Sequence, residues 1–109
     1  MKKLQLLTAL LFLGAAQAAF AANAQATWDD QCAKCHGADG KGQTKMGKKL
    51  NIRDFTDAKV QADFTDDQAF KAIKEGLTDK NGKTTMKAIE GLSDADMKAM
   101  VAFVRALKQ

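Results

Sequence analysis

The sequence predicts an all-α fold in which helices are joined by long loops. Three segments carry apolar residues at helical spacing, and none shows the sustained apolar/polar alternation of a half-buried strand. The chain of 109 residues has room for one domain, and its hydrophobic fraction of 46% is ordinary for a globular protein. The connections between the predicted helices are rich in Gly, Lys, Asp and Thr.

The first two helices are predicted at residues 27–35 and 64–76. The second begins with a capping box, because Thr65 is followed three residues later by Gln68. It ends at Gly76, since glycine readily adopts the left-handed conformation that terminates helices. Its apolar residues recur at helical steps and indicate one buried face: Ala69, Phe70, Ile73 and Leu77.

The last helix, predicted at residues 92–108, has the clearest pattern. Ser93 is a good N-cap, and Asp94 and Asp96 lie in the first turn, where negative charge stabilises the helix dipole. Arg105 and Lys108 lie at the opposite end. The helix carries a broad apolar stripe: Met97, Met100, Val101, Val104 and Leu107.

Two predicted loops, residues 37–56 and 76–87, are long for so small a domain. Loops of this length usually need internal support. A core built from fewer than 90 residues would also need more than one short disulfide to sustain it. We therefore expect another group to fill part of the interior.

The N-terminus has the layout of a secretory signal peptide. Lys2 and Lys3 precede an apolar run over residues 4–14, and an alanine-rich stretch with several A-x-A matches follows. We expect residues 1–21 to be removed and residues 22–109 to form the mature domain, although cleavage as late as residue 26 also fits. An uncleaved membrane anchor is less favoured, because polar residues interrupt the apolar run.

The charge of the mature chain is close to balanced. Without Lys2 and Lys3, 15 of the 17 Lys and Arg residues remain against 13 Asp and Glu, so the formal net charge falls from +4 to +2. Nucleic-acid-binding proteins usually carry a dense basic face, so nucleic acid is not an expected partner.

The segment C-A-K-C-H contains both cysteines and the only histidine of the chain. Two thiols separated by two residues on a helix can reach the two vinyl groups of a haem and form thioethers. The next residue, His36, then lies under the ring with its imidazole directed at the iron. The spacing therefore predicts covalent haem attachment through Cys32 and Cys35, with His36 as an iron ligand.

Three other kinds of site use the same residue types. A thioredoxin-like redox pair would follow a strand, and none is predicted before Trp28. A zinc site would need further ligands, but the chain has no second Cys or His group. A Cys/His nucleophile is weaker still, because residues so close on one helical turn rarely present thiolate and base face to face.

The segment C-A-K-C-H-G-A-D-G-K-G, together with residues 82–105, resembles the small single-haem class I c-type cytochromes, which are bacterial periplasmic electron carriers. The similarity extends from about Trp28 to Leu107. It implies three or four helices wrapped around one covalently bound haem c, with the first and last helices crossing.

The sixth iron ligand must be sought among the methionines, because there is no second histidine. Met97 and Met100 belong to the apolar stripe of the last helix, where filling the core is the better interpretation. Met46 could reach the opposite face of the haem only if its loop doubled back around the edge of the haem ring. Met86 has enough chain before it to reach the opposite face of the haem, and it falls on the axial-ligand position of the resembling family. We therefore predict Met86 as the distal ligand.

The chain departs from the resembling family by having no proline. The family often has proline next to the ligand methionine, and in the loop whose carbonyl orients the histidine. We expect both loops to be less rigid here.

The predicted function is a one-electron carrier in the periplasm, exported and soluble, monomeric and not an enzyme. Redox partner proteins are implied, and we expect no stable membrane insertion after signal cleavage. Partners with an acidic surface would suit the lysines near the haem motif and Met86: Lys34, Lys41, Lys45, Lys48, Lys49, Lys83 and Lys87. The alternative is a haem-based small-molecule sensor or weak peroxidase in which Met86 dissociates from iron.

Overall fold

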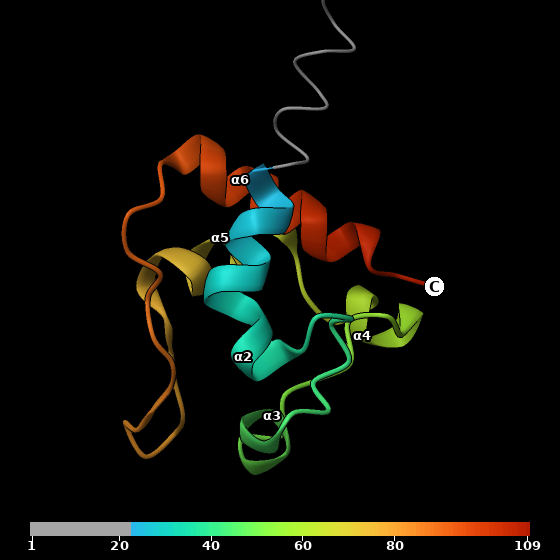
Figure 1. Ribbon diagram of the computed structural model, residues 1–109. Helices are drawn as coiled ribbons and strands as arrows, with labels where there is room; N and C mark the ends of the chain where they lie inside the picture. Colours follow the sequence, from blue (N-terminus) through green and yellow to red (C-terminus); the bar gives the residue numbers. More distant parts are fainter. Residues whose placement is uncertain (1–22) are drawn as a thin grey trace, which may run out of the picture.

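The computed structural model describes residues 23–109, which form a helical domain with one small hairpin (Figure 1). Residues 23–27 are α-helical and continue into a π-helical turn, η1 (Trp28–Cys32), and then into α2 (Ala33–His36). These segments form one continuous first helix. The remaining elements follow in this order: α3 (Lys45–Lys49), α4 (Ala58–Ala62), α5 (Asp66–Glu75), β1 (Leu77–Thr78), β2 (Thr84–Met86) and α6 (Asp94–Ala106).

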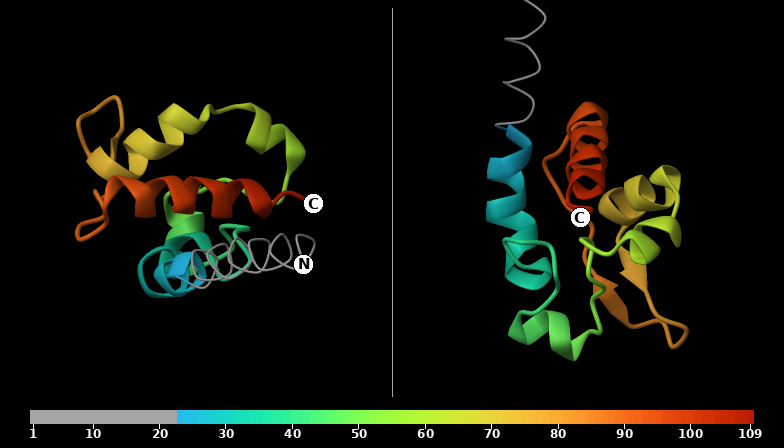
Figure 2. Two further views of the ribbon diagram at one scale, coloured as in Figure 1. Left: turned by 90° about the horizontal axis from the view of Figure 1, so that it is seen from above. Right: turned by 90° about the vertical axis from the view of Figure 1, so that its right-hand side faces the viewer.

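The core lies where the first helix crosses α6, as the family resemblance implied (Figures 1 and 2). Trp28 is only 2% exposed and contacts Met100, Val104 and Ala24 within one buried cluster. The ring of Phe103 lies 5.1 Å from that of Trp28, measured between centroids. Burying a tryptophan and a long apolar helix face supplies much of the hydrophobic free energy available to a domain of this size.

The caps of α5 and α6 agree with the sequence analysis. Thr65 and Gln68 form the predicted capping box, and α5 ends at Gly76, whose φ is +78°. Ser93 caps α6 and forms a second capping box with Asp96. These caps satisfy backbone N–H groups that would otherwise lack partners, so they fix where the two packed helices begin.

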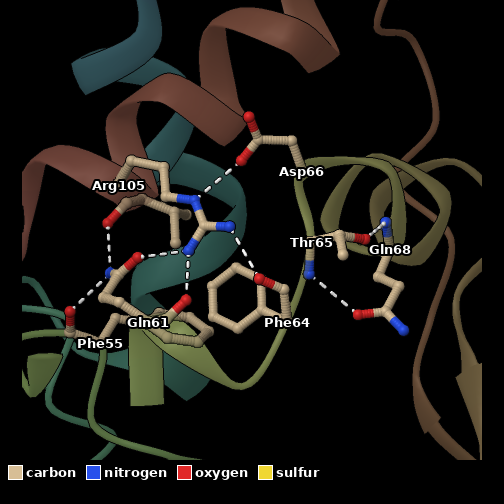
Figure 3. A network of polar contacts seen from close by, with 8 residues as sticks. Phe55, Gln61, Phe64, Thr65, Asp66, Gln68 and Arg105 are labelled. Atoms are coloured by element: carbon tan, nitrogen blue, oxygen red, sulfur yellow. Dashed lines mark hydrogen bonds and ion pairs between the residues drawn. The ribbon is translucent and has the colours of Figure 1, made fainter. Parts of the chain in front are cut away.

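A polar network joins α6 to the segment between α4 and α5 (Figure 3). The Arg105 guanidinium donates to Asp66 Oδ1 at 2.8 Å, to Gln61 Oε1 at 3.0 Å and to the Phe64 carbonyl at 2.8 Å. It also lies 4.3 Å above the centre of the Phe64 ring. The buried Gln61 amide donates in turn to the Phe55 carbonyl at 2.7 Å. Arg105 thereby anchors a loop that carries Phe55 toward the first helix.

The structure differs from the sequence prediction by containing a small sheet. β1 and β2 pair antiparallel, with Leu77 opposite Met86, and Asp79 Oδ1 accepts hydrogen bonds from the backbone of Asn81 and Lys83 in the turn. Strands of two and three residues are too short to show an alternating pattern. The expectation of no sheet was therefore wrong at this hairpin.

The predicted long loop 37–56 also contains regular structure. α3 lies within it and begins at Thr44, whose side chain accepts from Gly47 N–H; α4 follows and begins at Asp57 in the same way. Each is a single short helix of five residues, which has no room for a recognisable apolar stripe. Across residues 23–109, no helix has the length and apolar character needed to cross a membrane.

Candidate functional site

The first helix carries Cys32, Cys35 and His36 at its C-terminal end. Cys32 closes the π-helical turn, in which the backbone N–H of Ala33 bonds to the Trp28 carbonyl. Such turns often occur at functional sites, because they change the direction of the side chains that follow. All three predicted site residues are partly buried, so they lie at the boundary between the core and the surface.

His36 lies close to two aromatic rings. The Phe55 ring is stacked on the imidazole at a centroid distance of 5.2 Å and an interplanar angle of 23°. The Trp28 ring lies 5.6 Å away at an angle of 38°. Burial lowers the pKa of His36, which favours the neutral imidazole that a metal ligand must provide. Its Nδ1 atom is buried and has no hydrogen-bond partner within residues 23–109.

The backbone around His36 is held on both sides. Trp28 Nε1–H donates to the Gly37 carbonyl at 3.1 Å, and Gly42 N–H donates to the His36 carbonyl at 2.8 Å. The first of these hydrogen bonds is buried and satisfies the polar atom of the core tryptophan. Trp28 thus belongs to the core at the helix crossing, and it also fixes the end of the helix that carries His36.

α3 supports the motif from below in the view of Figure 1. Thr44 Oγ1 donates to the Cys35 carbonyl at 2.6 Å and accepts from Gly47 N–H at 2.8 Å. A Cβ atom added at Gly47 would lie 2.8 Å from the Cys35 carbonyl oxygen, and closer still to that of Gly42. Because these atoms are backbone, only glycine allows α3 to approach the cysteine motif so closely.

A hollow of about 570 Å³ is lined by residues of the first helix, the end of α5 and the hairpin. Its lining includes Gln31, which directly precedes Cys32, and Met86 at the end of β2. This volume is within the range of cofactor and small-molecule sites, roughly 300–1,000 Å³. Cys32, Cys35 and His36 do not themselves line it. The structure therefore brings together the three motif residues, and it places Met86 in the lining of a hollow that Gln31 also lines.

The Met86 segment is anchored to the end of α5. Ile89 N–H donates to the Ile73 carbonyl at 2.9 Å, which joins the chain after β2 to the last turns of α5. A Cβ atom at Gly76 would lie 2.5 Å from the Met86 carbonyl oxygen and 2.9 Å from Ala88 N. Gly76 thus combines a left-handed backbone with a close approach to the strand that carries Met86.

The other methionines of the described chain occupy different surroundings. Met97 and Met100 are 6% and 2% exposed and belong to the core, as their helical spacing predicted. Met46 is 42% exposed on α3 and does not line the hollow. Among these methionines only Met86 lines the hollow, and its ligand role stays a prediction.

The structure does not favour the other sites considered for the cysteines. Burial and the neighbouring Cys35 raise the pKa of the Cys32 thiol to about 11, whereas reactive redox and nucleophilic cysteines have lowered pKa values. Within residues 23–109, no three His, Cys, Asp or Glu side chains converge as a metal-ion site requires. The donors present are two thiols, one imidazole and the thioether of Met86, which lines the hollow, and this set fits haem c.

Residues 21–108 match the cytochrome c family. The chain belongs to this family. The KustC0563 c-type cytochrome, a solved structure, is 31% identical; the match covers 78% of this chain and 96% of that one, with a TM-score of 0.66. No curated protein matches the chain. Membership implies one covalently bound haem c with its iron and supports a haem-based electron carrier.

Several residues that surround the cytochrome's motif could not be identified from the sequence. Phe55 and Thr44 lie in the predicted loop 37–56, and neither belongs to a recognisable spacing. The T-x-x-G pattern from Thr44 to Gly47 could have indicated a cap near the motif. Nothing in the sequence could have indicated that Phe55 stacks on His36.

Proposed function

We propose that this cytochrome is a periplasmic one-electron carrier in which Cys32 and Cys35 form the haem thioethers and His36 and Met86 are the axial ligands. The observation that carries the proposal is the shared hollow, which has Gln31 of the motif helix and Met86 of the hairpin in its lining. A thioether donor therefore lines the same hollow as one residue of the helix that carries the thiols and the imidazole.

Haem c supplies, when bound, an iron that cycles between Fe(III) and Fe(II). The chain's own contribution is its donor set and its protection of the site. His36 would supply one imidazole, and the soft, neutral thioether of Met86 would favour the ferrous state, which raises the reduction potential relative to ligation by two histidines. The packing of α6 on the first helix shields one side of the site from water.

Electron transfer without bond chemistry suits these residues better than catalysis. His36 and Met86 would hold the iron of the haem, which would leave it no free position for a substrate. A peroxidase would also need an acid-base group near the iron, and the chain has no histidine besides His36. We therefore propose that the protein is not an enzyme.

We infer that redox partners with acidic surfaces dock near α3 and the end of the motif. Four lysines there are exposed and form no ion pair within residues 23–109: Lys34, Lys45, Lys48 and Lys49. Unpaired surface lysines attract acidic partners at long range and release them readily, because water and salt screen their charge. Export is proposed from the signal-like residues 1–21, which lie outside the described residues.

The proposal is tested by a spectroelectrochemical titration of the purified holoprotein, combined with exposure of its reduced form to carbon monoxide. We expect a single reversible one-electron wave and no rapid change of the reduced spectrum with carbon monoxide. Rapid formation of a carbon monoxide adduct by the untreated reduced protein would overturn the carrier proposal. It would favour the sensor or weak peroxidase instead.

A further inference from the structure

The Nδ1 atom of His36 is a buried polar atom that the carrier function leaves unexplained. Histidines that ligate a metal usually donate the N–H of their other ring nitrogen to a carbonyl or carboxylate, which fixes the rotation of the ring. No such acceptor is within hydrogen-bond distance of His36 Nδ1 among the described residues. The packing around the ring is therefore the restraint on the plane of this imidazole that the described residues provide.

The two aromatic neighbours of His36 restrict that plane directly. Phe55 lies nearly parallel to the imidazole, at 5.2 Å and 23°, and Trp28 lies nearby at 5.6 Å and 38°. Rotation of the imidazole about its Cβ–Cγ bond would drive its edge into these rings. Packed interiors resist such a movement, because neighbouring side chains have no free volume into which to withdraw.

Phe55 is itself held in place by three independent contacts. Its backbone N–H donates to the Gly40 carbonyl at 2.9 Å, and its carbonyl accepts from the Gln61 amide at 2.7 Å. Its ring packs against the edge of Phe64 at 5.8 Å, and the Arg105 guanidinium covers Phe64 (Figure 3). The network that joins α6 to α4 therefore ends at the face of the histidine ring.

We propose that Phe55 is a positioning residue that fixes the plane of the His36 imidazole by stacking, in place of a hydrogen bond to Nδ1. The proposal rests on the proposed function, because it takes His36 as the proximal ligand. An imidazole whose N–H makes no hydrogen bond is also a weaker electron donor than one bonded to a carbonyl. Stacking therefore orients the ligand without increasing its basicity.

The test compares the ferric electron paramagnetic resonance spectra of the holoprotein and its variants, because the g values of a low-spin haem depend on the plane of its axial imidazole. We expect Phe55→Leu to shift or broaden the g values. Phe64→Leu removes a ring that packs on Phe55 but does not stack on His36. It should change the g values less than Phe55→Leu does, because both backbone hydrogen bonds of Phe55 remain. Phe55→Tyr retains the flat ring and should preserve the g values.

Unchanged g values in Phe55→Leu, or an equal shift in Phe64→Leu, would overturn the proposal. Thermal unfolding measures the structural cost of each variant separately. If Phe55→Leu yields no holoprotein, Phe55→Met, which keeps an apolar chain without a flat face, is judged by the same criterion. A failure of the proposed His/Met ligation can be told apart from a failure of this proposal. In that case the wild-type protein itself would lack the weak far-red absorption band.

Discussion

Gly76 shows how a single residue controls the approach of Met86 to the rest of the fold. Its φ of +78° favours glycine, and a Cβ atom there would lie 2.5 Å from the Met86 carbonyl oxygen. Gly76→Ala should therefore displace β2 as well as strain its own backbone. We expect a loss of about 2–4 kcal/mol in the free energy of unfolding, from the strain and overpacking together.

Gly82→Ala is the matched control for this prediction. Gly82 has nearly the same φ, +79°, but nothing lies within 4 Å of an added Cβ atom. Its substitution should cost only about 1 kcal/mol, because left-handed strain is the sole penalty. Chemical denaturation of both variants measures the difference, and equal losses would contradict the close approach of Gly76 to Met86.

Individual site residues could be predicted from the sequence only where their spacing along the chain is itself what the chemistry requires. Cys32, Cys35 and His36 are adjacent in the sequence, so their pattern alone indicated haem attachment. The sequence indicates Met86 because it falls on the axial-ligand position of the resembling family. The other methionines are less suited, since two belong to an apolar helix face and the loop of Met46 would have to double back. Phe55 is 19 residues beyond His36, and only the folded chain brings the two rings together.

The helices were predictable where a cap and an apolar stripe coincide. α5 and α6 satisfy both conditions, and their capping boxes begin at Thr65 and Ser93 as expected. α3, α4 and the β1–β2 hairpin have capping or turn residues but are too short for a stripe. Their existence depends on tertiary contacts, such as the approach of Gly47 to the Cys35 carbonyl, which no local pattern encodes.

Arg105 of α6 joins this helix to α4 and α5. Even its replacement by lysine, which keeps the charge, should therefore lower the stability of the fold. Lysine cannot reproduce a planar guanidinium that bonds Asp66, Gln61 and Phe64 together. We expect Arg105→Lys to reduce the free energy of unfolding by about 2–3 kcal/mol, because hydrogen bonds from a charged donor are lost in a partly buried site.

Arg53→Lys provides the control. Arg53 forms its ion pair with Asp63 at the surface, where both side chains are 54% exposed. Such pairs contribute little, so the free energy of unfolding should change by less than about 0.5 kcal/mol. Urea denaturation of the two holoproteins compares them, and similar losses would show that the Arg105 network does not stabilise the junction.

At the scale of the whole molecule, the crossing of the first helix and α6 bears on where the mature chain begins. Ala24 is 7% exposed and belongs to the same buried cluster as Trp28 and Met100. Cleavage as late as residue 26 would remove it from the core. We therefore expect the exported protein to begin near Ala22, which intact-mass measurement of the holoprotein would reveal. A mature chain beginning at Thr27 would contradict this expectation.

The central claim of the proposed function is that Met86 on the hairpin and His36 on the first helix are the two protein ligands of one haem iron. The most direct measurement is the far-red absorption of the oxidised holoprotein, where a weak band reports a bond between methionine sulfur and ferric iron. Met86→Ala should abolish this band, and Met46→Ala, a change at an exposed methionine, should leave it intact. A band that survives Met86→Ala, or that is absent from the wild-type protein, would contradict the account.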